Sequence, residues 1–146
     1  MPFAKALTWQ APRVIDFSVG PNAGILTTPN TAIFIADGDY ELVSATEIHE
    51  TLATDGGGVT LDVVKCTGVQ AAAAGATMLA STFNLKATIN TVVRKDRGNG
   101  GLQTSRQKCQ ITKGDRIALN FGGVLTALTG MCVCVILQPY LRKQKW

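Results

Sequence analysis

Histidine and cysteine are the residue types in this chain best suited to nucleophilic or metal chemistry. His49 is the single histidine, so a Ser-His-Asp or Cys-His arrangement would have to use it. It lies in Glu47-Ile48-His49-Glu50, which has strand composition and lacks the glycine-flanked serine of a nucleophile elbow. The sequence therefore predicts a solvated histidine on a strand face, no catalytic residue and no bound cofactor.

The four cysteines are Cys66, Cys109, Cys132 and Cys134. Cys132 and Cys134 would lie on the same face of one strand, because side chains alternate along a strand. Structural zinc sites usually place two to four residues between paired cysteines, and here there is one. Residues two apart in a strand are separated by roughly 6.6–6.8 Å, at the limit of what a disulfide spans. We therefore expect reduced cysteines that pack as small hydrophobic residues, and no metal site.

Two acidic, glycine-containing stretches are interpreted as turns. Asp37-Gly38-Asp39 resembles a fragment of a calcium loop, but the glutamate that would close such a loop at the twelfth position is absent. Residues 55–58, with the sequence DGGG, lack the Lys-Ser/Thr ending of a phosphate-binding loop. Turn chemistry accounts for both, because Asp and Gly favour turns.

Short runs of β-branched and apolar residues, bounded by Gly, Asn, Asp and Pro, predict the elements that would position these residues. Residues 70–80 predict a loop or one short turn, and residues 94–101 an exposed hairpin tip. The result is about eight strands at roughly 8–12-residue spacing, which is typical of a β-sandwich or barrel. The expected strands are Arg13 to Val19, Ala32 to Ala36, Tyr40 to Leu52, Val59 to Cys66, Phe83 to Val93, Leu102 to Thr112, Arg116 to Phe121 and Leu125 to Tyr140.

The 146 residues predict one domain, residues 13–146 with a short basic tail, preceded by an arm over residues 1–12. No stretch approaches the roughly 20 apolar residues of a membrane span. Trp9 and Trp146 lie near the chain ends. Either they pin the ends to the domain, or they anchor in a partner's pocket, since tryptophan is enriched at binding hot spots.

Charge is low and slightly basic. Charged residues make up 16% of the chain against an average of about 25%, which is typical of a protein that packs against neighbours and also of an ordinary small β domain. The net charge is +4, with basic clusters at 94–97 and 142–145. Neither cluster is interleaved with aromatic residues for base stacking. They are solvated loops, or they contact an acidic protein or a nucleic-acid backbone, and no specific nucleic-acid partner is predicted.

Three patterns carry a resemblance to a known family. These are "G-x-Y-x-x-V" followed by a glycine turn and "VTLxV-x-K-x-TG", then "L-A-S-x-F-x-L-K-A-x-x-N-T-V", then "GDR-x-A-L-x-x-x-G-x-L". On these patterns residues 38–137 resemble the head decoration (capsid cement) proteins of tailed bacteriophages. Cys66, Cys132 and Cys134 depart from the family, where aliphatic residues are expected, and so does the basic tail.

The resemblance implies a jelly-roll-like sandwich that forms homotrimers on the outer surface of the phage head and clamps neighbouring major capsid subunits. It implies a structural protein without enzymatic activity, made in the bacterial cytoplasm. The alternative is a phage fibre or knob module that binds a host receptor or glycan, which would present exposed aromatic platforms. The residues expected to contact partners are Phe3, Leu7, Trp9, Tyr140, Arg142 and Trp146.

Overall fold

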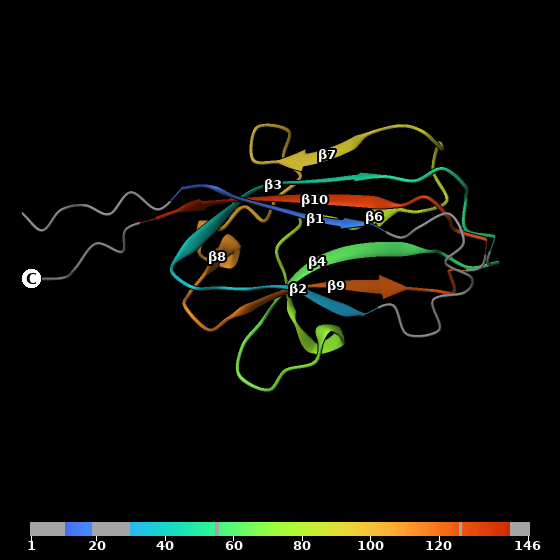
Figure 1. The fold of residues 1–146 in the computed structure, drawn as a ribbon. Helices are drawn as coiled ribbons and strands as arrows, with labels where there is room; N and C mark the ends of the chain where they lie inside the picture. Colours follow the sequence, from blue (N-terminus) through green and yellow to red (C-terminus); the bar gives the residue numbers. More distant parts are fainter. Residues whose placement is uncertain (1–10, 19–29, 55, 126, 141–146) are drawn as a thin grey trace, which may run out of the picture.

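The computed structural model describes residues 11–18, 30–54, 56–125 and 127–140. Within them the secondary structure is almost entirely β (Figure 1). Two short 3-10 helices, η1 (Ala72–Ala74) and η2 (Arg106–Cys109), lie in connections between strands. The strands are β1 (Arg13–Ser18), β2 (Thr31–Ile35), β3 (Tyr40–Ile48), β4 (Thr60–Cys66), β5 (Ala76–Thr77), β6 (Phe83–Asn84), β7 (Val93–Asp96), β8 (Gln110–Ile111), β9 (Arg116–Gly122) and β10 (Cys132–Pro139).

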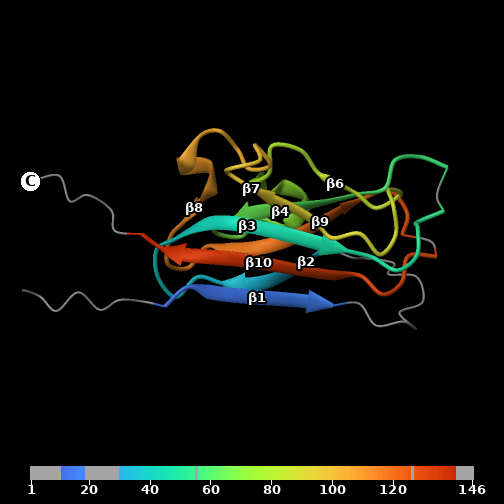
Figure 2. The same ribbon diagram turned by 90° about the horizontal axis from the view of Figure 1, so that it is seen from above.

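The strands form two antiparallel sheets packed face to face. One sheet has the order β1-β10-β3-β7, with β8 also paired to β3, and the other has the order β2-β9-β4-β5, with β6 also paired to β4. Figure 1 shows the two layers, and Figure 2 shows β1, β10 and β3 side by side. The predicted all-β sandwich is confirmed.

The strand order is that of a jelly roll, in which the first strand pairs with the last. β5 and β6 lie one after the other along β4, so they act as one interrupted strand. β7 and β8 lie along β3 in the same way. Counting each interrupted strand once, the described residues form eight strand positions, as the sequence spacing predicts.

Alternation of apolar residues places the core between the sheets. Ile117 and Leu119 of β9 face inward with no exposed surface, as do Val133 and Val135 of β10. Burying side chains of this size contributes about 1.5–3 kcal/mol each. In the part of the chain that the structure describes, no helix has the length and apolar character needed to cross a bilayer.

Two of the predicted strands are wrong over most of their length. Residues 83–93 contain only the two-residue β6 and the start of β7. The Asn84 side chain accepts a hydrogen bond from the Lys86 N–H at 2.9 Å, which closes a turn and ends β6. Residues 102–112 form an isolated bridge at Leu102, then η2 and β8. Their polar side chains lack the two-residue alternation that would hold a strand against the core.

The predicted hairpin tip at residues 94–101 is partly wrong. Arg94, Lys95 and Asp96 belong to β7 and pair with β3. The turn itself comprises residues 97–100 and is exposed. The following chain leaves β7 and crosses toward residue 79, so the turn does not join two neighbouring strands.

Candidate interaction surface

His49 is buried, so the prediction of a solvated histidine is wrong. Its Nδ1 lies 2.7 Å from Glu47 Oε1, and its Nε2 lies 3.2 Å from the Ala87 carbonyl oxygen. Both side chains of the pair are 1% exposed. Desolvation raises the pKa of Glu47, and the hydrogen bond from His49 opposes that shift. The pair connects the end of β3 to the loop before β7 and is closed to any substrate.

Glu47 faces inward because of its register. It pairs with Val133 of β10 and Val93 of β7, whose side chains face the core. A charged or polar group in this position needs a hydrogen-bond partner, because an unpaired buried carboxylate is costly. His49 supplies that partner two residues along, where β3 has ended.

The cysteines occupy two kinds of environment. Cys66 and Cys109 are buried, as predicted. Cys132 and Cys134 share one face of β10, also as predicted, but that face is the outer one and both are only half-buried. Among the described residues, no three His, Cys, Asp or Glu side chains are close enough to hold a metal ion.

In the turn at residues 37–39, the side chain of Asp37 binds two other side chains. Asp37 accepts a hydrogen bond from the Tyr40 hydroxyl and forms an ion pair of 2.7 Å with Arg13. These contacts, with the Tyr40 bond first, lower the pKa of Asp37. The carboxylate is thereby occupied in joining β1 to the β2–β3 connection, which confirms the turn interpretation.

The outer face of the β1-β10-β3-β7 sheet forms a broad surface that we call the open face. Its central row runs in register through Asp16, Cys134, Thr46 and Arg94. An acidic residue at one edge and a basic residue at the other therefore flank uncharged residues. The open face comprises the outward residues of these strands that keep exposed surface: Val14, Asp16, Ser18, Cys132, Cys134, Ile136, Thr46, Ile48, Arg94 and Asp96.

The neighbours of Cys134 hold its thiol in the protonated form. Partial burial and the adjacent carboxylate of Asp16, with which the thiol forms a hydrogen bond, raise the pKa of Cys134 to about 11. Nucleophilic cysteines are instead those whose pKa is lowered toward or below neutral pH. Cys134 is therefore a component of a surface and is not an activated nucleophile.

One end of the open face is hollowed into a cavity of about 320 Å³ that we call the arginine pocket. Glu41 of β3 lies in it, with its side chain 11% exposed, and accepts two hydrogen bonds from Arg106, at 2.9 and 3.0 Å. Arg97 contacts the same carboxylate at 3.5 Å. The remaining lining residues are Leu42, Val43, Gln138, Pro139 and Tyr140.

The outer face of the other sheet is covered by its own chain. η1 and its neighbours pack on Val64, Cys66 and Ala118, which are 1–2% exposed. A Cβ at Gly75 would lie 2.8 Å from Val64 Cγ2 and 2.9 Å from Cys66 Sγ, so only glycine allows this approach. We call this the covered face.

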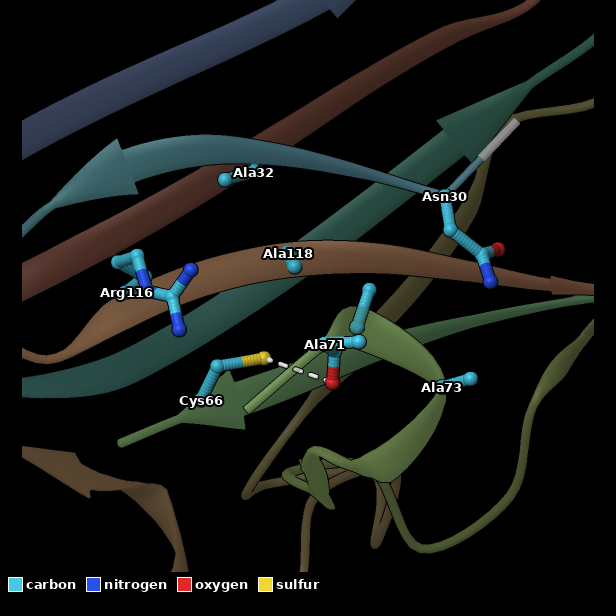
Figure 3. Close-up of a pocket in the computed structure, with 8 residues that line it drawn as sticks. Asn30, Ala32, Cys66, Ala71, Ala73, Arg116 and Ala118 are labelled. Atoms are coloured by element: carbon cyan, nitrogen blue, oxygen red, sulfur yellow. Dashed lines mark hydrogen bonds between the residues drawn. The ribbon is translucent and has the colours of Figure 1, made fainter. Parts of the chain in front are cut away.

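A second cavity, of about 300 Å³, lies between η1 and β2 on the covered face. Figure 3 shows alanines around it and Arg116 at the start of β9. The Cys66 thiol donates a hydrogen bond to the Ala71 carbonyl oxygen. The Arg116 guanidinium donates to the carbonyl oxygens of Gly68 and Gln70 at 3.0 and 2.7 Å. This arginine fastens the loop before η1 to the sheet.

Tyr140 is the one predicted partner-binding residue that lies within the described part of the chain. It is half-buried and lines the arginine pocket. The pocket was missed from the sequence, because 56 and 65 residues separate Glu41 from its two arginines. In the sequence, only the basic cluster at 94–97, which contains Arg97, pointed toward the pocket. The other predicted residues lie outside the described residues: Phe3, Leu7, Trp9, Arg142 and Trp146.

Comparison with known proteins finds similarity in fold. No family model and no curated protein sequence matches the chain. A chain from the solved capsid of Ralstonia phage GP4 is similar in structure, with a TM-score of 0.52 and 15% sequence identity. The similarity covers 90% of this chain and 85% of that one. At this identity it establishes a shared fold over almost the whole chain.

Proposed function

We propose that this chain is a structural, non-enzymatic protein of a bacteriophage virion, a decoration or cement protein on the outer surface of the head. The observation that carries the proposal is the jelly-roll strand order together with a fold shared, over 90% of the chain, with a phage capsid chain. The family resemblance of residues 38–137 supports the same function. The single histidine, His49, is buried and hydrogen-bonded to Glu47, which agrees with a role without catalysis.

Such a protein stabilises a shell by adding contacts that must break before neighbouring subunits can separate. We propose that it forms a homotrimer and clamps major capsid subunits. Obligate interfaces of roughly 2,000 Å² or more can supply the strength, although area does not convert directly into affinity. Closed three-fold symmetry would also protect exposed sheet edges such as that of β1 from open-ended pairing.

The two chain ends are proposed to make part of the shell contact. Arg13 pairs with Leu137, so β1 begins at the end of the sandwich where β10 finishes. The segments that carry the predicted contact residues therefore attach at one end of the domain, beside the arginine pocket and Tyr140. Segments that order on binding can wrap large surfaces. The proposed contact residues are Phe3, Leu7, Trp9, Tyr140, Arg142 and Trp146.

Electron microscopy of labelled protein on virions tests the proposal. We expect label on the head surface and, by light scattering, an oligomer of three times 15.4 kDa. Deleting residues 1–12 is expected to leave a folded trimer that no longer binds heads in a pull-down. A monomer, or label confined to tail appendages, would contradict the proposal. The fibre alternative predicts exposed aromatic platforms, and no aromatic side chain among the described residues is exposed.

A further inference from the structure

We propose that the open face, with the arginine pocket at its end, is the surface that docks on an acidic protein partner, and that the pocket receives a carboxylate side chain of that partner. The inference rests on the proposed function in one respect, because the partner would then be a subunit of the shell. It adds which face of the sandwich makes the contact, and through which chemistry.

The arginine pocket carries an excess of positive charge. Two guanidinium groups, of Arg97 and Arg106, share the single carboxylate of Glu41. Arg106 donates to Glu41 through Nε and Nη2, and its Nη1 makes no hydrogen bond to any of the described residues. A guanidinium presents five N–H donors in a planar fork that suits carboxylates. A second carboxylate entering the pocket would balance the charge and use the remaining donors.

The pocket is also prepared in advance. Arg97 donates through Nη1 to the carbonyl oxygens of Gln103 and Thr104, both at 3.4 Å, and through Nη2 to Glu41. These bonds hold the guanidinium in place before any partner arrives. A charged group that is already positioned loses less side-chain entropy on binding, which favours affinity.

The composition of the open face is that of a protein interface. Lysine is absent from the outward positions of its paired strands, and the one lysine of β7, Lys95, lies over the Phe83 ring. Arginine and tyrosine are enriched at interface cores, where lysine is depleted. Between the charged edges lie the uncharged side chains of Cys132, Cys134 and Ile136, which can be desolvated at small cost.

The charge of the arginine pocket favours an acidic partner over a second copy. Two guanidinium groups face one carboxylate there, so copies placed pocket to pocket would bring like charges together. An acidic surface would instead be attracted during approach, and its binding would weaken as salt concentration rises. The proposed trimer contact would then use other surfaces of the sandwich.

The first test compares two arginines that are bonded alike. Arg97→Gln removes a pocket guanidinium, and Arg116→Gln is the matched control, because Arg116 also donates to two carbonyl oxygens but lies on the covered face. Binding of the full chain to heads that lack it is measured over a range of salt concentrations. We expect Arg97→Gln to bind about tenfold more weakly and with less salt dependence, and Arg116→Gln to bind like the wild type.

The second test compares two isoleucines that point outward from opposite sheets. Ile136→Asp adds a negative charge to the open face, and Ile35→Asp makes the same change on the outer face of β2, where Ile35 is 68% exposed. We expect only Ile136→Asp to lose binding to heads, because its carboxylate would repel an acidic partner. Maleimide labelling with mass spectrometry provides an independent readout. Over a labelling time long enough for the slow Cys134 thiol, Cys132 and Cys134 are expected to be labelled in the free protein and protected on heads.

A soluble probe separates failure of this inference from failure of the proposed function. Poly-L-glutamate is titrated into the full-length wild type and Arg97→Gln, with poly-L-lysine as the control polymer. Binding of poly-L-glutamate that Arg97→Gln weakens supports the inference, even if wild-type protein never binds heads and the proposed function fails. Wild-type binding to heads with unchanged binding of Arg97→Gln and no thiol protection would overturn the inference alone. Thiols protected in the free oligomer would place a second copy on the open face and would also overturn it.

Discussion

The outer faces of the two sheets differ, although the same alternation of residues builds both. The covered face carries Val64, Cys66 and Ala118 beneath η1, so its small apolar residues belong to a second, minor core. The open face carries Cys132, Cys134 and Ile136, and they remain half-exposed. The difference comes from the connections, because the β4–β5 segment folds back over its sheet. The β7–β8 segment instead brings two arginines to the edge of the other sheet. An outer face is therefore either structural or available for binding according to where a loop lies.

The largest expected contrast comes from placing the same charge on each face. Val64→Asp buries an unpaired carboxylate under η1. We therefore expect the free energy of unfolding to fall by about 3–5 kcal/mol. Val14→Asp makes the same change on the open face, where Val14 is 61% exposed, and should cost less than about 1 kcal/mol. Denaturant unfolding of both variants measures the contrast. Equal losses would show that the covered face is not a core.

A smaller contrast comes from two glycines. Gly75→Ala forces a Cβ against Val64 and Cys66 at under 3 Å, and we expect a loss of about 1–3 kcal/mol from overpacking. Its backbone has a φ of −66°, so the expected loss is steric and not conformational. Gly56→Ala is the control, because no atom lies within 4 Å of its added Cβ.

Thermal or urea unfolding measures the stabilities of Gly75→Ala and Gly56→Ala against the wild type. Gly56→Ala should match the wild type or be slightly more stable, because alanine restricts the unfolded chain. If Gly75→Ala were also neutral, η1 would not pack on the sheet as described.

The smallest expected effect concerns the reactivity of the open face, with no change in stability. Because the pKa of Cys134 is raised to about 11, its alkylation by iodoacetamide should accelerate about tenfold for each pH unit and level off near pH 11. The neutral thiol is the form that predominates at pH 8, so labelling there should be slow. Peptide fragmentation by mass spectrometry separates Cys134 from Cys132.

Asp16→Asn sharpens this measurement. The Asp16 carboxylate is one of the groups that raise the pKa of the Cys134 thiol, so its removal should lower that pKa and speed labelling at pH 9. Burial is the larger cause and remains, so the pKa should stay above its ordinary value. A Cys134 labelling rate that levels off near pH 9 in the wild type would contradict the described environment.

Local pattern was sufficient for the strands with clear alternation, but not for residues 83–93 and 102–112. Alternation in residues 116–121 and the apolar run ending at Leu137 predicted β9 and β10, because a strand repeats every two residues wherever it lies. The same rule placed Cys132 and Cys134 on one face. Turn chemistry likewise predicted the turn at Asp37, but not the ion pair that its side chain forms with Arg13, which lies 24 residues earlier.

Tertiary structure alone decided what each outward or polar residue does. Periodicity assigns a side chain to one of two faces but does not say which loop covers that face, so the burial of His49 was predicted wrongly. The arginine pocket depends on Glu41, Arg97 and Arg106 meeting across at least 56 residues, and no local pattern records such a meeting. Electrostatic and packing energies depend on distance in space, whereas sequence motifs report distance along the chain.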